Sequence, residues 1–336
     1  MIVMAAYTVD LAQGNTVKGK PIKSNTINCY LRDVASLIAD HCGRDPRYTN
    51  PATKELAPSI KAVLDECKRY EGMPQRADPY TLEMHDCLMA YNHNIDANHD
   101  GLLRALEDSF NIGSYLGCRL REYAQDNEHK YFSTGGEVAP NGTKRAFTLH
   151  DIQLYDTAGR PVSIATFLRS PNSVASAIIT FSWQKNNDHG EERRLVRNIH
   201  FPSRDPITSL HNLLCRFDRL VGIEHTNIPL AVYKDNTQVV FLHGRAISEE
   251  LSNLAQRHYG LSASELKKHY RYTPHSIRAG AAVILHSAGS SETQLKFLLR
   301  WRSDAFFAYL RNVPHLVNEQ NLAFCRMAEA SLQLRS

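Results

Sequence analysis

Apolar residues recur at helical spacing through the first quarter of the chain. Segments with this spacing occupy residues 26–42, 60–72 and 81–93. Each begins beside residues that favour a helix start, such as Ser24 and Thr81. Residues 1–20 show no comparable stripe, so we expect them to be weakly structured. The pattern predicts a small helical unit over residues 1–88.

The middle of the chain changes to alternating and β-rich patterns. The β-rich runs are residues 146–156, 176–184 and 193–201. The helical runs around them are residues 102–116 and 208–222, and residues 239–260 supply a short strand followed by another helix. Turn-forming residues fill the loop at residues 185–192, so the two runs beside it are expected to pair as a hairpin. We therefore predict a mainly α fold with a small antiparallel β-sheet (α+β) and a second domain over residues 89–336.

The overall charge says little about partners, whereas its distribution says more. The 336 residues contain 39 Lys and Arg against 35 Asp and Glu, a net charge of +4. Residues 1–88 are balanced, with eleven of each sign, but residues 265–311 contain eight basic and three acidic residues. A local basic excess is typical of a surface that contacts DNA, although a solvated basic face gives the same pattern.

The cysteines and the hydropathy limit the cellular setting. Seven cysteines are scattered with no CxxC pair, which favours reduced thiols and argues against a disulfide framework or zinc knuckle. No apolar run approaches the eighteen residues that a membrane span needs, and there is no basic leader of a signal peptide. We therefore expect an intracellular protein with no membrane partner.

One stretch matches a calcium-binding loop. Asp96, Asn98, Asp100, Gly101 and Glu107 satisfy the pattern D-x-[DN]-x-[DN]-G-x5-E. The match is single, whereas such loops usually work in pairs. The alternative is the start of the helix over residues 102–116, with its acidic side chains facing water.

The segment over residues 273–313 carries the residue types for chemistry on a phosphate. His275 and Arg278 are three apart, so in a helix they lie on one face and can reach the same anion. Arginine grips two phosphate oxygens at once, and histidine can donate one hydrogen bond. The Tyr309 hydroxyl is a weak nucleophile that needs nearby cations or a base.

A short helix is expected to carry Tyr309. Ser303 or Asp304 can cap it, and Pro314 stops it. Trp301 lies eight residues before the tyrosine. The segment thus predicts a phenol at the end of a short helix beside the His275/Arg278 pair.

These motifs together resemble those of a known family. HSIRAGAA, then LRW, then a tyrosine followed by LRN resembles the second catalytic box of the tyrosine recombinases, the phage-integrase family. RWRSDAFFAYLRN is similar to the eukaryotic crypton-type mobile-element recombinases, which carry Trp where many bacterial members have His. The resemblance implies an upstream arginine and lysine.

Both upstream residues have candidates. Arg119 stands in a GxRxxE arrangement that resembles the first catalytic box, with Glu122 as a buried orienter. Lys185 stands where the strand before the turn-rich loop ends; Lys144 and Arg193 are the substitutes for it. The resemblance thus implies Tyr309 as nucleophile, Arg119 and Arg278 on the phosphate with His275 and Trp301, and Lys185 as proton donor.

The resemblance also implies an overall function. It implies a helical core-binding domain that clamps DNA, shortened at its N-terminus, followed by a catalytic domain. The activity would be cleavage and rejoining of double-stranded DNA through a 3′-phosphotyrosine, in recombination or integration of a mobile element. It implies no cofactor or metal, a homo-oligomer (tetramer) on DNA, a nuclear location if the host is eukaryotic, and a terminal helix over residues 315–334 that packs on a neighbouring protomer or on its own domain.

Two other functions fit parts of the sequence. One is a DNA-binding or strand-relaxing relative, either a domesticated recombinase that does not cut or an enzyme like type IB topoisomerases. The other is a non-enzymatic helical module with a single calcium loop, in which His275, Trp301 and Tyr309 are ordinary core or surface residues.

Overall fold

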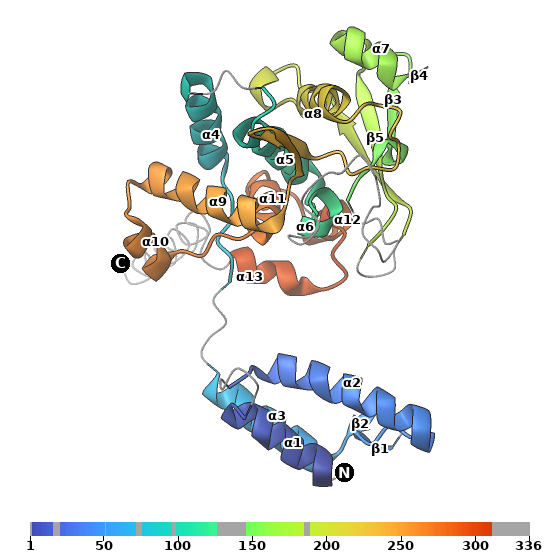
Figure 1. Cartoon of the computed structure of the whole chain (residues 1–336), viewed down its shortest axis with the longest axis vertical. Coiled ribbons are helices and arrows are strands. Elements are labelled where there is room, and N and C mark those ends of the chain that lie inside the picture. The colour runs from blue at the N-terminus through green and yellow to red at the C-terminus, as the bar shows by residue number, and fades with distance from the viewer. Residues whose placement is uncertain are drawn as a thin grey trace, which may run out of the picture. The chain divides into compact units, whose positions relative to one another are not determined.

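The computed structural model describes residues 2–15, 21–50, 52–71, 76–95, 99–125, 146–184 and 189–310. The chain divides into two compact units, Met1–Gln75 and Arg76–Ser336, each with its own hydrophobic core (Figure 1). The predicted boundary after residue 88 differs from this division, which falls inside the Pro- and Asp-containing stretch at residues 74–81. The reason is that the helix after the stretch packs on the second unit and buries Met84 and Leu88 in its core.

The first unit is built from three helices and one short strand pair. The helices are α1 (Ile2–Gln13), α2 (Ser24–Cys42) and α3 (Pro58–Tyr70), and the strands are β1 (Tyr48–Asn50) and β2 (Glu55–Leu56). The predicted stripe of α2 is confirmed at Ile27 and Leu31, which are fully buried against Ile60 and Leu64 of α3. Proline in the first turn of α3 removes a donor that a helix start leaves unpaired anyway.

Helix α1 shows that the expectation for residues 1–20 was wrong over Ile2–Gln13. Its apolar residues are spread around the helix instead of forming a stripe, so periodicity gave no signal. The helix packs against both α2 and α3, with Met4 and Leu11 buried between them. Tertiary packing therefore stabilises α1, although the local sequence pattern does not predict a helix there.

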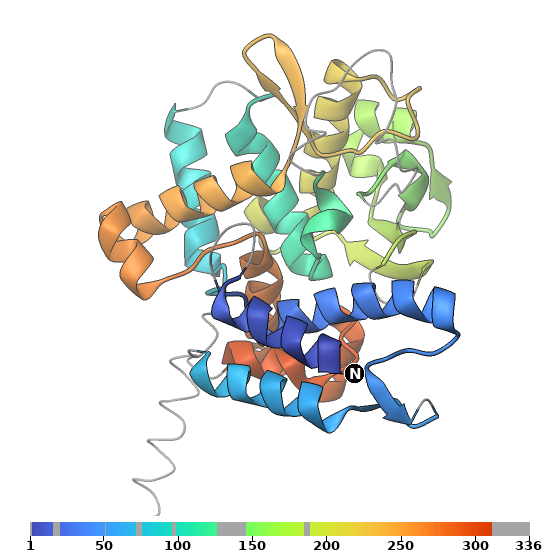
Figure 2. The same cartoon turned by 60° about the horizontal axis from the view of Figure 1, so that its bottom comes forward.

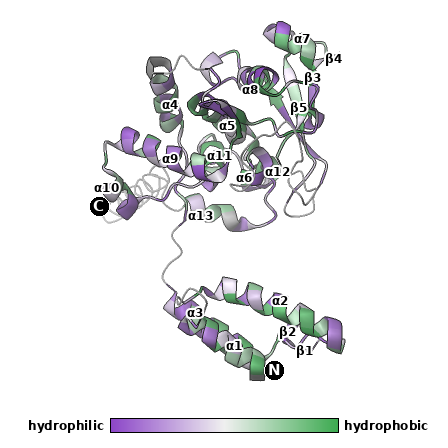
Figure 3. Ribbon diagram, viewed as in Figure 1, coloured by the Kyte–Doolittle hydropathy of each residue, from purple (hydrophilic) through white to green (hydrophobic). Residues whose placement is uncertain are grey.

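The second unit is organised around α5 (Leu102–Leu116), in which nine of the fifteen residues are buried. Helices α4 (Leu82–Ile95), α8 (Pro206–Leu220) and α11 (His275–Ser287) pack against it. In Figure 3 α5 is largely hydrophobic, whereas α9 (Gly244–Tyr259), farther from the centre, is largely hydrophilic. None of the helices in the described ranges is both long and apolar enough to cross a membrane.

A four-stranded antiparallel sheet covers one side of this core. Its order is β4 (Pro161–Val162), β3 (Ile152–Tyr155), β5 (Ser176–Phe181) and β6 (Glu191–Val196). In the register Ile152 pairs with Ile179, and both face the core with Leu195. The mainly α fold with a small antiparallel sheet is thus confirmed.

The strands differ from the expected runs at their ends. The run predicted from residue 146 is a strand only from Ile152, because the side chains of Thr148 and Asp151 cap a 3-10 turn, η2 (Leu149–Asp151). The run predicted to residue 201 ends as a strand at Val196. Two residues later, the backbone N–H of Asn198 donates to the Asp205 carboxylate. At the start of the first run and at the end of the last, hydrogen bonds between side chains and the backbone thus replace the hydrogen bonds between strands.

Helix α11 crosses the chain just before α4 at very short range. The Tyr80 backbone N–H donates to the Ser276 carbonyl, at 2.9 Å. A Cβ on Gly280 would stand 1.9 Å from the Tyr80 carbonyl oxygen, so only glycine permits this approach. The contact fixes the start of α11, where His275 and Arg278 lie.

The remaining elements complete the second unit. They are α6 (Leu120–Tyr123), α7 (Ile164–Arg169), η3 (Pro171–Ser173), η4 (Pro202–Arg204), β7 (Val232–Asp235), β8 (Gln238–Phe241), α10 (Ala263–His269), α12 (Glu292–Leu299), η5 (Asp304–Phe306) and α13 (Phe307–Leu310). The β7–β8 hairpin, coloured gold, stands out from the helices in Figure 2. Helix α13 packs against α11, and Phe306 and Leu310 are buried with Leu295 and Leu299 of α12.

Candidate active site

The first turn of α11 places His275 and Arg278 on one face, as the spacing predicted. Arg278 is 2% exposed, and its guanidinium donates to the carbonyl oxygens of Gly117 and Leu299. Within the described residues no carboxylate forms an ion pair with it. Burial and, to a lesser extent, the neighbouring cations Arg119 and Arg300 together lower the pKa of Arg278 to about 9. A buried cation held by main-chain carbonyls favours an anionic ligand.

Gly117 makes the close approach of these segments possible. It ends α5 in the left-handed conformation, with φ +57°, and a Cβ there would stand 2.3 Å from a Leu299 side-chain carbon. Helix α12 therefore ends directly against the end of α5. The carbonyls of both helix ends point at Arg278, where helix dipoles place partial negative charge.

Arg119 reaches the same place from the start of α6. Its Nη2 donates to the Arg300 carbonyl at 3.4 Å, and Arg278 Nη2 lies 3.5 Å from the same oxygen. Its Nη1 donates to Glu122 Oε1 at 3.1 Å and to Gln184 Oε1 at 3.4 Å. The structure therefore brings the two predicted arginines together although 159 positions separate them in the chain.

Glu122 is buried, as expected of an orienter, and it serves two arginines. It is 1% exposed, and its Oε2 accepts from Arg300 Nη2 at 2.7 Å. Arg300 was not among the predicted site residues. It is 6% exposed, its guanidinium lies 3.6 Å from the centre of the Phe181 ring, and its backbone has φ +55°. The sequence signal that could have indicated Arg300 is its position between the end of α12 and Trp301.

Tyr309 meets His275 directly. The Tyr309 hydroxyl oxygen lies 2.6 Å from His275 Nε2. The predicted short helix is present as η5 followed by α13, with Tyr309 half-buried near its end. Partial removal from water and, after it, the charges of Arg278 and Arg119 together lower the pKa of the His275 imidazole to about 4. The ring keeps an exposed face, so solvent moderates this shift, but its direction leaves a neutral ring that can accept the phenolic hydrogen.

Trp301 forms the wall between the arginine and the tyrosine. The Arg278 guanidinium lies 5.1 Å from the centre of the indole, and the Tyr309 ring lies 5.7 Å from it, edge to face. Its buried indole Nε1 has no hydrogen-bond partner among the described residues. A buried donor without an acceptor is costly, so this N–H suits an oxygen of a ligand.

The predicted lysine cannot be placed in this cluster. Lys185 and the substitute Lys144 lie outside the described residues. Arg193, the other substitute, lies within the described residues, and its contacts hold the strand pair β5–β6 against α12. It pairs with Glu191, and its Nη2 donates to the Phe297 carbonyl of α12 at 2.7 Å. The role of Lys185 therefore stays a prediction.

The residues of the calcium-like loop that can be seen are engaged with arginines. Asp100 pairs with Arg219 at 2.5 Å, and Glu107 pairs with Arg104 at 3.1 Å. Asp96 and Asn98 lie outside the described residues. In the described part of the chain, no three His, Cys, Asp or Glu side chains come together in a group that could hold a metal ion.

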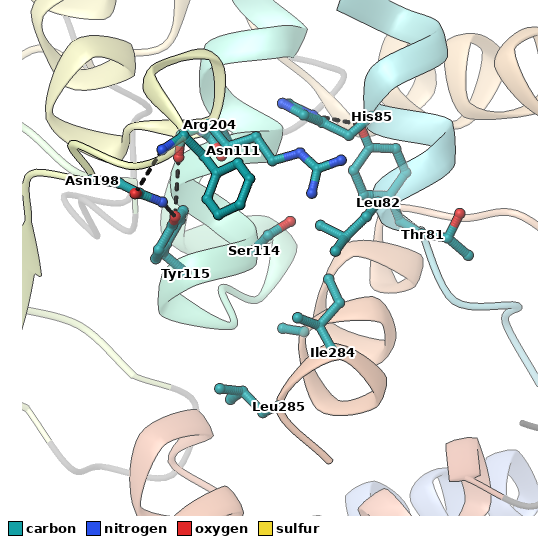
Figure 4. A pocket seen from close by; sticks show the side chains of 13 residues that line it. Thr81, Leu82, His85, Asn111, Ser114, Tyr115, Asn198, Arg204, Ile284 and Leu285 are labelled. Atoms are coloured by element: carbon teal, nitrogen blue, oxygen red, sulfur yellow. Dashed lines mark hydrogen bonds between the residues drawn. The ribbon is translucent and has the colours of Figure 1, made fainter. Parts of the chain in front are cut away.

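A separate cavity of about 250 Å³ lies between the start of α4, α5 and the later turns of α11 (Figure 4). Its wall includes Leu82, Tyr115 and Leu285, and a Tyr80–His85 pair joined by a 2.9 Å hydrogen bond. None of the described catalytic candidates lines it. The candidate catalytic side chains His275 and Arg278 lie at the other end of α11.

Comparisons with known proteins find similar solved structures only. No family model matches the chain, and no curated protein matches it. A structure of the Tn1549 transposon integrase with circular-intermediate DNA is similar at 13% identity, covering 95% of this chain and 84% of that chain, with a TM-score of 0.44. The XerA recombinase is similar at 15% identity, covering 96% and 91%, with a TM-score of 0.38.

A variant of the same integrase, bound to transposon right-end DNA, is similar at 11% identity, covering 97% of this chain and 84% of that chain, with a TM-score of 0.44. Likeness at this level establishes neither family nor chemistry. The arrangement of side chains within this chain has to support any function.

Proposed function

We propose that this chain cleaves and rejoins strands of duplex DNA through a covalent 3′-phosphotyrosine on Tyr309. The observation that carries the proposal is the 2.6 Å contact between the Tyr309 hydroxyl and His275, beside two arginines that share one carbonyl. Arginine pairs of this kind suit a phosphodiester, whose transition state places extra charge on the non-bridging oxygens. The site also agrees with the motifs that resemble the tyrosine recombinases.

In the proposed step the phenolic oxygen attacks the scissile phosphorus. The phenolic proton passes to neutral His275 Nε2, which is within hydrogen-bond reach. Arg119 and Arg278 stabilise the developing charge, with the indole N–H of Trp301 as a further donor. The bond to the 5′ oxygen breaks as the bond to tyrosine forms, and Lys185 is proposed to protonate the leaving oxygen.

The step conserves one phosphodiester-type bond, so it is reversible without an energy source. A 5′ hydroxyl of another strand can attack the phosphotyrosine and release the enzyme. Rejoining to a different strand is recombination, and two pairs of protomers on DNA would complete it. The RWRSDAFFAYLRN motif favours one form of this reaction, the integration of a crypton-type mobile element.

We further propose that the first unit, Met1–Gln75, contributes to a clamp on the duplex. The support is its position before the catalytic unit in the chain and its helical construction. If the host is eukaryotic, DNA as the substrate places the protein in the nucleus.

The test is formation of a covalent protein–DNA adduct. A pool of nicked duplexes, in which the released strand segment diffuses away, traps the phosphotyrosine, and denaturing electrophoresis detects it. We expect an adduct with the native chain and none with Tyr309→Phe, while both bind DNA equally. Tyr155→Phe is the matched control, since within the described part of the chain this hydroxyl donates locally to Gln153, and it should form the adduct normally. An adduct that survives Tyr309→Phe would refute the assignment.

A protein that binds the pool without forming an adduct would instead be a non-cutting relative. A protein that forms the adduct and relaxes supercoiled plasmid, but does not exchange strands between paired sites, would be a topoisomerase-like relative. The adduct assay and the plasmid assay together separate these functions.

A further inference from the structure

A surface cleft of about 520 Å³ opens beside the candidate active site, between the β5–β6 hairpin and α12. Its lining residues are His189, Gly190, Glu191, Lys296, Phe297, Arg300, Trp301 and Arg302. Trp301 is common to the cleft and to the catalytic cluster. A ligand in the cleft would therefore lie directly beside a phosphodiester bound by Arg119 and Arg278.

The walls of the cleft are held together by Arg193. Its Nη2 donates to the Phe297 carbonyl at 2.7 Å, and its guanidinium lies 4.7 Å from the centre of the Phe297 ring. These contacts join β6 to α12. The cleft is therefore preformed, which reduces the entropy lost when a ligand binds.

Basic residues outnumber acidic residues in the lining of the cleft. Three of its lining residues are Lys or Arg and one is acidic. The acidic residue, Glu191, is already neutralised, because it pairs with Arg193 and accepts from Gln184 Nε2 at 2.9 Å. Its negative charge therefore does little to repel an anion.

Arg300 supplies a second, independent sign of a ligand. Its Nη atoms are bonded to Leu116 O and Glu122, but its buried Nε has no hydrogen-bond partner among the described residues. The nearest carboxylate oxygen, on Glu191, is 4.0 Å away, beyond hydrogen-bond range. A buried guanidinium N–H without an acceptor, on the wall of a basic cleft, fits an oxyanion or a water that bridges to one.

We infer that this cleft binds a backbone phosphate of the DNA next to the scissile phosphate, with Lys296 and Arg302 at its rim. The inference rests on the proposed function for the identity of the anion. Each strand of a duplex presents a phosphate about every 3.4 Å along the axis. A duplex bound at the active site must therefore bring a neighbouring phosphate past a cleft that shares Trp301.

Lys296 has an internal competitor for that phosphate. It forms a 2.5 Å ion pair with Asp304, the first residue of the segment that carries Tyr309. Both side chains are well exposed, at 36% and 67%, so the pair contributes little and can exchange for a DNA phosphate. Binding in the cleft would release Asp304 from Lys296.

The test measures the salt dependence of DNA binding. Mixed-sequence duplex DNA is titrated with the full chain carrying Tyr309→Phe, so that no chemistry occurs, and anisotropy gives the affinity at several salt concentrations. The double variant Lys296→Ala/Arg302→Ala should bind more weakly, and the slope of log affinity against log salt should fall by about one, the value for one phosphate contact.

Two further variants sharpen the result. Lys234→Ala, on the exposed β7–β8 hairpin and outside the cleft lining, is the matched control and should leave the slope unchanged. Asp304→Asn should tighten binding by up to about fivefold without lowering the slope, because it removes only the competitor. Thermal melting confirms that each variant is folded.

The outcomes separate this inference from the proposed function. If the double variant has the same slope as Lys234→Ala, the cleft is not a phosphate site, even where the native chain forms the adduct. If the slope falls but the native chain forms no adduct, the cleft binds DNA and the proposed cleavage is wrong. Failure of the Tyr309→Phe chain to bind duplex DNA would overturn both.

Discussion

Arg278 is held in a way that depends on the shape of its side chain. Its planar fork spans the carbonyls of Gly117 and Leu299, which belong to the ends of two different helices. A lysine would keep the charge, but all of its N–H donors lie on one nitrogen, so it cannot span the two carbonyls as the planar guanidinium does. The guanidinium therefore has a positional role in the proposed reaction besides its charge.

We accordingly predict that Arg278→Lys impairs cleavage far more than binding. Adduct formation under single-turnover conditions should slow by about a hundredfold or more, the usual loss for one donor to a developing oxyanion, while DNA affinity stays within a factor of about two. Arg160→Lys is the control, because Arg160 is exposed and its ion pair among the described residues is the local one with Asp156. Equal rates for the two variants would contradict the role of the fork.

His275 should make stability depend on pH. Its folded-state pKa of about 4 is below the ordinary value of 6.5, because of burial and then Arg278, Arg119 and Arg76. Between these values the unfolded chain binds more protons than the folded one, so the free energy of unfolding should rise from pH 4 to 6.5 and then level off. In His275→Gln this rise should be smaller, as measured by urea unfolding across that range; an unchanged profile would contradict the shift.

The candidate site was predictable from sequence in its residue types and order, but not in how its charges are arranged. His275 and Arg278 share a helix face, and a spacing of three shows that directly. Arg300 could not be recognised in the same way. Its importance arises from Glu122 and Phe181, which lie far from it in the chain and meet it only after α5, α6 and β5 pack together.

At the scale of elements, α5 and α8 are joined through a buried ion pair. Asp108 Oδ2 accepts from Arg216 Nη2 at 2.6 Å, and both side chains are almost completely buried. Burial raises the pKa of Asp108 more than Arg216 lowers it, and the net result is a pKa of about 6. The pair lies on the helix whose end positions Arg278, so its loss bears on the site.

We predict that Asp108→Ala destabilises the second unit by about 3 to 5 kcal/mol, because it leaves Arg216 buried without its partner. Replacing both residues, as Asp108→Leu/Arg216→Met, should recover most of that loss. Glu249→Ala, at an exposed position of α9, should change little. Urea unfolding measures all three, and a double variant as unstable as the single one would contradict this account.

The predictions from sequence that missed or misplaced an element were wrong for related physical reasons. Helix α1 carries apolar residues all around, so its packing on α2 and α3, not its pattern, makes it a helix. The run from residue 146 loses its first residues as strand because Asp151 caps a turn. Helix α4 was assigned to the first domain because nothing in its own stripe shows which core Met84 enters.

At the scale of the whole molecule, the chain has two separate hydrophobic cores. The core of Met1–Gln75 comprises a few residues of α1, α2 and α3, whereas that of the second unit draws on nearly every element there. A small unit buries a smaller fraction of its surface and is correspondingly less stable. We therefore expect the clamp proposed for the first unit to belong to the less stable part of the protein.

This difference predicts two unfolding transitions, with the first unit melting at the lower temperature. Leu31→Ala removes a fully buried side chain of α2 and should lower the first transition alone, by a loss of about 2 to 5 kcal/mol in that unit. Leu37→Ala, on the same helix but 65% exposed, is the matched control and should leave both transitions in place. Differential scanning calorimetry distinguishes them. A single transition that Leu31→Ala shifts as a whole would show that the two cores unfold together, and that damage to the first unit also reaches the residues around Tyr309.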